Sequence, residues 1–318
     1  MTAGQDADTP LTPMSTASDK VHTCAIVVTY RPDDGIAARL QKLAAQVDAM
    51  VVVDNTPGGV DAWAVPMPAL DSIPFDIIEN HTNLGIATAL NIGLNHEFAT
   101  RCLWVLTMDQ DTLCYPEMVR TLLFTAGACP SAPAVIGGNY FDTKKGRHEV
   151  SANTSGPCLE RKTVITSGCL IDAAFAREIG GFRDDFFIDQ VDHEFCLRTR
   201  ANGRRVAISA KPVMQHSVGG WRGPRVPLLG WELPDHSALR KYYITRNSIA
   251  IAMNYWRKEP VWCLVRLTRL FAGVTSIVLL EPEKAKKIRA FATGLGDGLQ
   301  GRMGKCSHDW LSGKPRQS

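Results

Sequence analysis

The stretch Cys102-Leu103-Trp104-Val105-Leu106-Thr107-Met108-Asp109-Gln110-Asp111 joins an apolar run directly to two acids. The run is typical of a buried strand, so both carboxylates are expected at its C-terminal end, where open α/β sheets bind ligands. Residues i and i+2 of an extended chain point the same way. Asp109 and Asp111 can therefore share a divalent cation with waters and a ligand oxygen. A polar turn after the strand is the alternative, because Asp is common in turns.

The flanking segments alternate between strand and helix patterns. Strands are expected at 24–30, 50–53 and 75–79, and helices at 36–47, 86–98 and 116–127. This alternation predicts an α/β domain with a mainly parallel sheet flanked by helices. Farther along, the patterns indicate strands around Val135 and Val164 and at 206–208 and 213–214, and helices at 173–179 and 191–201.

These patterns divide the chain into four parts. Residues 1–21 are polar and predict a disordered leader, and residues 22–236 form the expected catalytic domain. Its last loop, 217–234, is rich in Gly and Pro and carries Trp221 and Trp231, as functional or disordered loops do. From 237 to 304 we expect a helical extension, followed by a flexible tail at 305–318.

Charge and cysteine content narrow the class of protein. The net charge of +3 is too small to indicate nucleic-acid binding. Residues 257–318 hold 12 Lys/Arg against 5 Asp/Glu, a net +7, which leaves 23 against 27, a net −4, for the rest. The nine cysteines are odd in number and include no C-x-x-C pair. Reduced thiols in a cytoplasmic protein are therefore expected, with neither a disulfide framework nor a zinc site.

The extension contains a long apolar segment, 261–280, followed by a basic cluster of Lys284, Lys286, Lys287 and Arg289. Twenty mostly apolar residues can span a bilayer, but Arg266 and Arg269 lie inside this segment, and charges within a span are costly. We therefore interpret it as a helix on the membrane surface with the cluster at headgroup level. A helix that only packs on the catalytic domain is the alternative.

Other polar residues follow the strands in order. Thr29 ends the first strand, and Asp54-Asn55 ends the second, where an Asp can accept hydrogen bonds from a base or a ribose. Gly85, in Asn83-x-Gly85, allows a ligand to approach the backbone, and Asn83 can cap the next helix. A plain turn or helix cap explains each of these residues equally well. A second Asn-x-Gly begins at Asn91.

Six motifs together resemble the inverting GT-A glycosyltransferases of family 2, in particular the bacterial rhamnosyltransferases that use dTDP-L-rhamnose. The resemblance covers about 22–300. The motifs are Val51–Asn55, Asn83–Ala87, Met108–Asp111, Thr166–Leu170, Phe187–Phe195 and Tyr242-Tyr243-x-x-Arg246-Asn247. The segment Leu279–Gly301 is most similar to the rhamnosyltransferases that convert mono- to dirhamnolipid.

The resemblance implies a GT-A, Rossmann-like fold and a set of residue roles. Mg²⁺ or Mn²⁺ would be bound by Asp111 and His216. The base would be Asp192, which stands where the family has an E-D pair. Here Val191 precedes it, so Asp189 remains a second candidate, and Glu194 is expected to be structural. Substrate binding is expected of Thr29, Asp54, Asn55, Asn83, Gly85, Asn91, Asp109, Arg246 and Asn247.

The implied activity is transfer of L-rhamnose from dTDP-L-rhamnose, with inversion, to a hydroxyl of a rhamnose-containing glycolipid. The enzyme would then work in the cytoplasm, peripherally at the inner face of the membrane. A polysaccharide or a cell-wall lipid-linked intermediate is the alternative acceptor, and a non-catalytic sugar-nucleotide-binding protein is a third possibility. A dinucleotide-binding dehydrogenase is excluded, because no G-x-G-x-x-G follows the first strand.

Overall fold

The computed structural model describes residues 23–63, 70, 72–151, 154–216, 225–226, 231–232 and 236–312. The expected leader and most of the Gly/Pro-rich loop, including Trp221, lie outside these residues. Within that loop, only the short strands β11 (Arg225–Val226) and β12 (Trp231–Glu232) are described, and they pair antiparallel.

The first half of the chain has the predicted α/β alternation. Its elements are β1 (Thr23–Thr29), α1 (Ile36–Ala44), β2 (Ala49–Asp54), η1 (Val60–Ala62), β3 (Phe75–Glu79), α2 (Ile86–Leu94), α3 (Glu97–Thr100), β4 (Trp104–Asp109), β5 (Leu113–Cys114) and α4 (Met118–Ala128). The helix expected over 86–98 is two helices. His96 has an extended backbone between them, and its side chain accepts a hydrogen bond from the Phe98 amide.

The second half contains both confirmed elements and corrections. It comprises β6 (Val135–Asp142), β7 (Arg147–His148), β8 (Cys158–Glu160), β9 (Cys169–Asp172), α5 (Ala173–Glu178), η2 (Asp184–Phe186), α6 (Val191–Ala201) and β10 (Val206–His216). The strand expected around Val164 is wrong, since β9 begins five residues later. The two short strands expected at 206–214 are one strand, whose register shifts on either side of Pro212.

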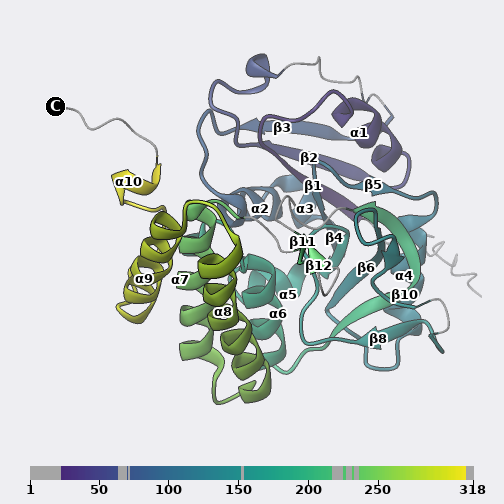
Figure 1. The fold of residues 1–318 in the computed structure, drawn as a ribbon. Helices are drawn as coiled ribbons and strands as arrows, with labels where there is room; N and C mark the ends of the chain where they lie inside the picture. The colour runs from purple at the N-terminus through teal and green to yellow at the C-terminus, as the bar shows by residue number, and fades with distance from the viewer. Residues whose placement is uncertain are drawn as a thin grey trace, which may run out of the picture.

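One sheet runs through the domain in the order β3-β2-β1-β4-β9-β6-β10-β5 (Figure 1). β3, β2, β1 and β4 are parallel, β9 is antiparallel between β4 and β6, and β6 is parallel to β10. Both faces are covered, because Ile26 belongs to one hydrophobic cluster and its neighbour Val27 to the other. Burial on both faces explains why the central strands β1 and β2 are continuous apolar runs, whereas β3 at the edge is only partly buried.

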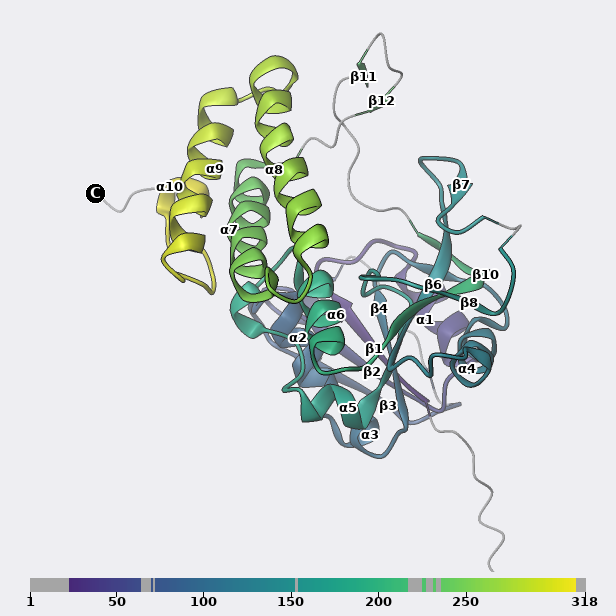
Figure 2. The ribbon, with the colours of Figure 1, turned by 90° about the horizontal axis from the view of Figure 1, so that it is seen from below.

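The C-terminal helices α7 (Ala238–Tyr255), α8 (Pro260–Leu280) and α9 (Lys284–Leu299) lie side by side at one flank of the domain (Figures 1 and 2). Ser237 caps α7 by accepting a hydrogen bond from the Arg240 amide. Two glycines of α9 allow the backbones to approach closely. A Cβ at Gly294 would lie 2.5 Å from the Tyr242 carbonyl oxygen, and one at Gly298 would lie 2.8 Å from that of Arg246.

The end of the described chain packs against the C-terminal helices. Residues 305–312, expected to be flexible, pack against the helices and end in α10 (Asp309–Ser312). The Cys306 amide donates to the Tyr243 hydroxyl at 2.7 Å, and His308 Nε2 lies 2.8 Å from Asp297 Oδ2. Leu311 is buried.

The expectation of reduced thiols is wrong for one pair, because Cys129 and Cys158 form a disulfide. The other seven cysteines are free, and six of them are buried. The pair joins the segment after α4 to β8, 29 residues later.

Candidate functional site

The carboxyl ends of β1, β2 and β4 meet at one edge of the sheet, where Thr29 pairs with Asp54 and Val28 with Asp109. Asp54 is fully buried. Its Oδ1 accepts from the Thr29 hydroxyl at 2.8 Å and from the Thr56 hydroxyl at 2.8 Å. Both sequence-identified residues therefore lie at the site, but in this structure they bind each other. Thr56 was not identified from the sequence.

The loop before α2 lies beside these strand ends. Asn55 is buried, and its side-chain nitrogen Nδ2 donates to the Gly85 carbonyl at 3.1 Å. Gly85 has φ of 88°, and a Cβ there would lie 2.5 Å from the Phe187 carbonyl oxygen. Only glycine fits this left-handed position. Asn83 Oδ1 accepts from the Gly85 amide at 2.9 Å, so Asn83 forms a turn and is not the expected helix cap, which is Gly85 itself.

Asp109, Asp111 and His216 come together at the ends of β4 and β10. One ligand atom from each lies within 4.8 Å of the others. Carboxylate oxygens and an imidazole nitrogen are suitable ligands for a divalent cation. Two hydroxyls support the cluster: Thr112 Oγ1 lies 2.8 Å from His216 Nδ1 and 2.6 Å from Ser167 Oγ. Thr112 directly follows the acid pair, yet nothing in its type marked it as a partner of His216.

Electrostatics in the cluster match cation binding. Burial raises the pKa of Asp109 to about 7, with smaller contributions from the negative charges of Asp111 and Asp192. Burial lowers the pKa of His216, although the nearby Asp111 and Asp142 oppose this shift. A neutral imidazole retains a lone pair for a metal, and a cation would relieve the repulsion between the carboxylates.

The residue between the two acids also has a role that the sequence did not reveal. The Gln110 side chain pairs with the backbone of Tyr30, accepting from its amide at 2.7 Å and donating to its carbonyl at 3.1 Å. The Gln110 carbonyl accepts from Arg39 Nε at 2.6 Å. These bonds hold the acid loop to the residue after β1 and to α1.

Three acids near the start of α6 have different partners. Both oxygens of Asp189 are held by Arg240, at 2.5 and 3.2 Å. Glu194 is buried between the Tyr255 hydroxyl at 2.7 Å and Arg198 at 3.0 Å. Arg198 and Glu194 therefore form an ion pair, and Glu194 has structural partners.

Asp192 is the acid with an available oxygen. Its Oδ1 accepts from the His193 amide at 2.8 Å, and within the described residues its Oδ2 has no hydrogen-bond partner. The side chain is about a quarter exposed. Its negative charge contributes to the raised pKa of Asp109. A half-buried carboxylate with a free oxygen can accept a proton from a bound hydroxyl.

Arg246 and Asn247, expected to bind substrate, are fully buried and hold a loop instead. Arg246 donates to the carbonyls of Asp185 and Phe186, both at 3.2 Å. Asn247 donates to the carbonyls of Phe186, Ile188 and Asp189 at 2.8 to 3.0 Å. The expectation of direct contact is therefore corrected: both residues position the segment that leads to Asp192.

That segment requires such support. Phe187, Asp189 and Gln190 have φ of 61°, 64° and 65°, a left-handed backbone that non-glycine residues rarely adopt. Strained backbone of this kind persists where surrounding bonds hold it, often at functional sites. Asn91 has a similar positioning role, because its amide bonds both the carbonyl and the amide of Phe182, at 2.7 Å each. Asn91 is only partly buried, so its contact with substrate stays a prediction.

Comparisons with known proteins agree with this arrangement. The model of the family described as "Glycosyl transferase family 2" matches residues 24–186, just over half of the chain. The chain is 26% identical over 295 residues to "dTDP-rhamnosyl transferase RfbF" of Shigella flexneri, covering 88% of this chain and 96% of that protein.

Solved structures of Staphylococcus aureus TarS, residues 1–349, are also similar. One is 15% identical with a TM-score of 0.48, and the complex with UDP-GlcNAc is 14% identical with a TM-score of 0.49. Each match covers 88% of this chain and 92% of the TarS chain.

Proposed function

The chain belongs to glycosyl transferase family 2, and we propose that it transfers L-rhamnose from dTDP-L-rhamnose, with inversion, to a hydroxyl of a rhamnose-containing glycolipid, as in the conversion of mono- to dirhamnolipid. The observation that carries the donor is the similarity to the Shigella dTDP-rhamnosyl transferase, which extends over nearly the full length of both chains.

The donor would occupy the edge where β1, β2 and β4 end. Thr29 and Asp54 form its floor, and the Asn83–Gly85 turn forms its wall. Asp109 would face the nucleotide. The diphosphate would lie beside Asp111 and His216, which with Asp109 can hold Mg²⁺ or Mn²⁺. A bound cation would neutralise the negative charge that develops on the departing diphosphate.

Asp192 is the proposed base. It would accept the proton of the acceptor hydroxyl while that oxygen forms a bond to the anomeric carbon of rhamnose. The bond from this carbon to the diphosphate breaks in the same displacement, and its electron pair leaves with dTDP. One displacement inverts the configuration. Asp189 is less suitable because Arg240 holds both of its oxygens.

The proposed lipid acceptor is supported by α8. This helix is long and apolar enough to cross a membrane, yet only 11% of its apolar stretch is buried within the protein. Val261, Leu264, Phe271 and Leu279 are between 49% and 72% exposed. An apolar face of this size on a surface helix favours contact with lipid. We therefore propose that the protein is peripheral at the cytoplasmic face of the membrane.

The basic cluster after α8 is smaller than the sequence indicated. Lys287 is buried and donates to Glu281 at 2.9 Å, so it is not available to lipid headgroups. Lys284, Lys286 and Arg289 are exposed. Arg289 stacks on Trp310 at 4.2 Å, which leaves the two lysines as the main candidates for headgroup contact.

The direct test is to incubate the purified protein with dTDP-L-rhamnose and a panel of acceptors: monorhamnolipids, lipid-linked sugar phosphates and free oligosaccharides. Products are detected by mass. Addition of a single deoxyhexose to a monorhamnolipid supports the full proposal. Transfer only to lipid-linked or free saccharides would retain the donor and replace the acceptor. If no dTDP were released with any acceptor, the proposal that dTDP-L-rhamnose is the donor would be rejected.

A further inference from the structure

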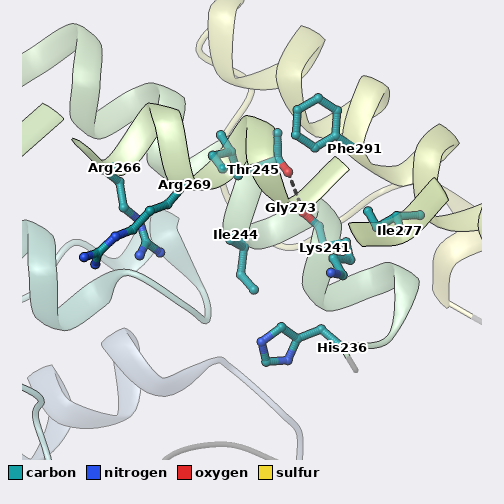
Figure 3. A pocket seen from close by; sticks show the side chains of 10 residues that line it. His236, Lys241, Ile244, Thr245, Arg266, Arg269, Gly273, Ile277 and Phe291 are labelled. Atoms are coloured by element: carbon teal, nitrogen blue, oxygen red, sulfur yellow. Dashed lines mark hydrogen bonds between the residues drawn. The ribbon is translucent and has the colours of Figure 1, made fainter. Parts of the chain in front are cut away.

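A cavity of about 180 Å³ lies between the C-terminal helices (Figure 3). α7 contributes Ile244 and Thr245, α8 contributes Arg266, Arg269 and Ile277, and α9 contributes Phe291. His236, just before α7, closes the cavity from below in this view. None of these residues lies at the sheet edge where β1, β2 and β4 end, and none belongs to the Asp109–Asp111–His216 cluster.

Two guanidinium groups dominate the charge of the cavity. Arg266 and Arg269 lie about one helical turn apart on α8, and their side chains point in the same direction (Figure 3). Within the described part of the chain, neither forms an ion pair. Lys241, which also lines the cavity, is paired with Glu281 at 2.8 Å. The positive charge of Arg269 adds to burial in lowering the pKa of Arg266, and an anion bound between the two arginines would relieve their repulsion in a partly dry site.

Apart from His236, Thr245 and the paired Lys241, the remaining lining is apolar. Ile244, Leu270, Ile277 and Phe291 come from three different helices and form the wall of the cavity. Typical pockets for whole small ligands measure about 300–1,000 Å³. A cavity of 180 Å³ therefore fits a compact anionic group and the beginning of an alkyl chain, and the rest of such a ligand would extend outside.

The cavity lies near the proposed base. On α8, one turn before Arg266, the Trp262 ring lies 5.5 Å from the ring of His193, the neighbour of Asp192. On α7, one turn before Ile244, Arg240 holds both oxygens of Asp189. In keeping with this placement, the negative charges of Asp192 and Asp189 oppose the lowering of the pKa of Arg266 by burial. A ligand whose anion meets Arg266 and Arg269 would thus place its remaining polar groups near Asp192. This is the placement that an acceptor requires, because its hydroxyl must reach the base.

We propose that this cavity binds the acidic end of the acceptor: a carboxylate or a phosphate attached to an alkyl chain. The inference rests on the proposed function and specifies the acceptor as an anionic amphiphile. Arg266 and Arg269 neutralise its acidic group, and the apolar wall holds the first part of its chain. A carboxylate would come from a free acidic glycolipid, and a phosphate from a lipid-linked sugar.

Calorimetry without donor tests the site directly, using the full chain and three probes below their micellar concentrations: dodecanoate, dodecyl phosphate and neutral dodecyl glucoside. The anionic probes should bind more tightly than the neutral one. Arg269→Gln should weaken anionic binding by about tenfold or more, as expected for loss of a hydrogen bond to a charged group. Arg257→Gln is the matched control, because it removes an exposed arginine of the same extension that does not line the cavity.

A second variant separates the contribution of the anionic group from that of the alkyl chain. Phe291→Ala should weaken the binding of all three probes alike, whereas Arg269→Gln should weaken the binding of only the two anionic probes. Tighter binding of dodecanoate would indicate the free glycolipid acid, and tighter binding of the phosphate would indicate a lipid-linked acceptor. Equal affinity for neutral and anionic probes, or unchanged affinity in Arg269→Gln, would overturn the proposal.

The same variant distinguishes failure of this site from failure of the proposed function. Where rhamnosyl transfer is detected, Arg269→Gln should raise the acceptor KM about tenfold, with a smaller change in kcat. An unchanged acceptor KM rejects the cavity and leaves the transferase activity standing. Conversely, arginine-dependent probe binding in a protein that releases no dTDP from dTDP-L-rhamnose supports the cavity and rejects the donor.

Discussion

Replacing Asp109 by Asn should stabilise the protein at alkaline pH, although it removes a conspicuous acid of the site. Burial raises the pKa of this carboxyl from 3.8 to about 7. Because the folded pKa lies above the unfolded one, the unfolded chain releases this proton first. The free energy of unfolding therefore falls as the pH rises from about 4 to about 7, and it remains lowered above that range.

The size of the effect follows from the shift. About three pKa units at 1.36 kcal/mol each amount to about 4 kcal/mol at pH 8.5. At pH 5.5 the unfolded carboxyl is already ionised and the folded one is not, so the cost is about 2 kcal/mol. The Asn side chain cannot ionise. The stability of Asp109→Asn relative to the wild type should thus increase by about 2 kcal/mol between pH 5.5 and 8.5.

Urea unfolding at both pH values, followed by circular dichroism, measures this difference. Asp34→Asn is the control, because Asp34 is exposed and the substitution changes the total charge equally. Added Mg²⁺ should stabilise the wild type at pH 8.5 more than Asp109→Asn, since a cation at the cluster favours the ionised carboxylate. A stability difference that is the same at pH 5.5 and 8.5 would refute a raised pKa for Asp109.

Three further predictions concern the base, the metal and the membrane. Asp192→Asn should lower kcat at least about 100-fold with donor affinity retained; a nearly normal Asp192→Asn beside an inactive Asp189→Asn would move the base to Asp189. Asp111→Asn and EDTA should each reduce turnover about tenfold or more, the latter reversibly with Mn²⁺, and full activity in EDTA would argue against the metal. Lys284→Glu with Lys286→Glu should weaken binding to anionic vesicles about tenfold at low salt, and vesicle binding equal to that of the wild type would contradict the membrane proposal.

The sequence predicted the part of the fold in which local pattern and tertiary structure agree. β1, β2 and β4 are mainly apolar runs because both of their faces are buried, and the acids Asp54 and Asp109 that the patterns identified end β2 and β4. The pairing of Asp109 with Asp111 was predictable from the end of one strand, whereas His216 was assigned to the metal only through the family resemblance; in the structure its ligand atom lies with theirs.

Long-range pairing was not predictable, because a single sequence does not show which distant residues meet. Asp189 and Arg240 are 51 residues apart, and Cys129 and Cys158 are 29 residues apart. Arg246 and Asn247 were misassigned for a related reason. A polar motif within a helix was taken to face a ligand, whereas backbone carbonyls of a strained loop satisfy it in the interior. Nothing local to a polar residue reveals that kind of burial.

The bonds from Arg246 and Asn247 to the loop at 185–189 have a consequence for engineering. Domain exchange is a common route to new acceptor specificity, and the boundary before Ser237 offers an obvious crossover point. A chimera joined there would receive α7 from one parent and the loop from the other, so the carbonyls of Phe186 and Asp189 would face a foreign partner. Productive recombination should therefore inherit the loop and α7 from the same parent.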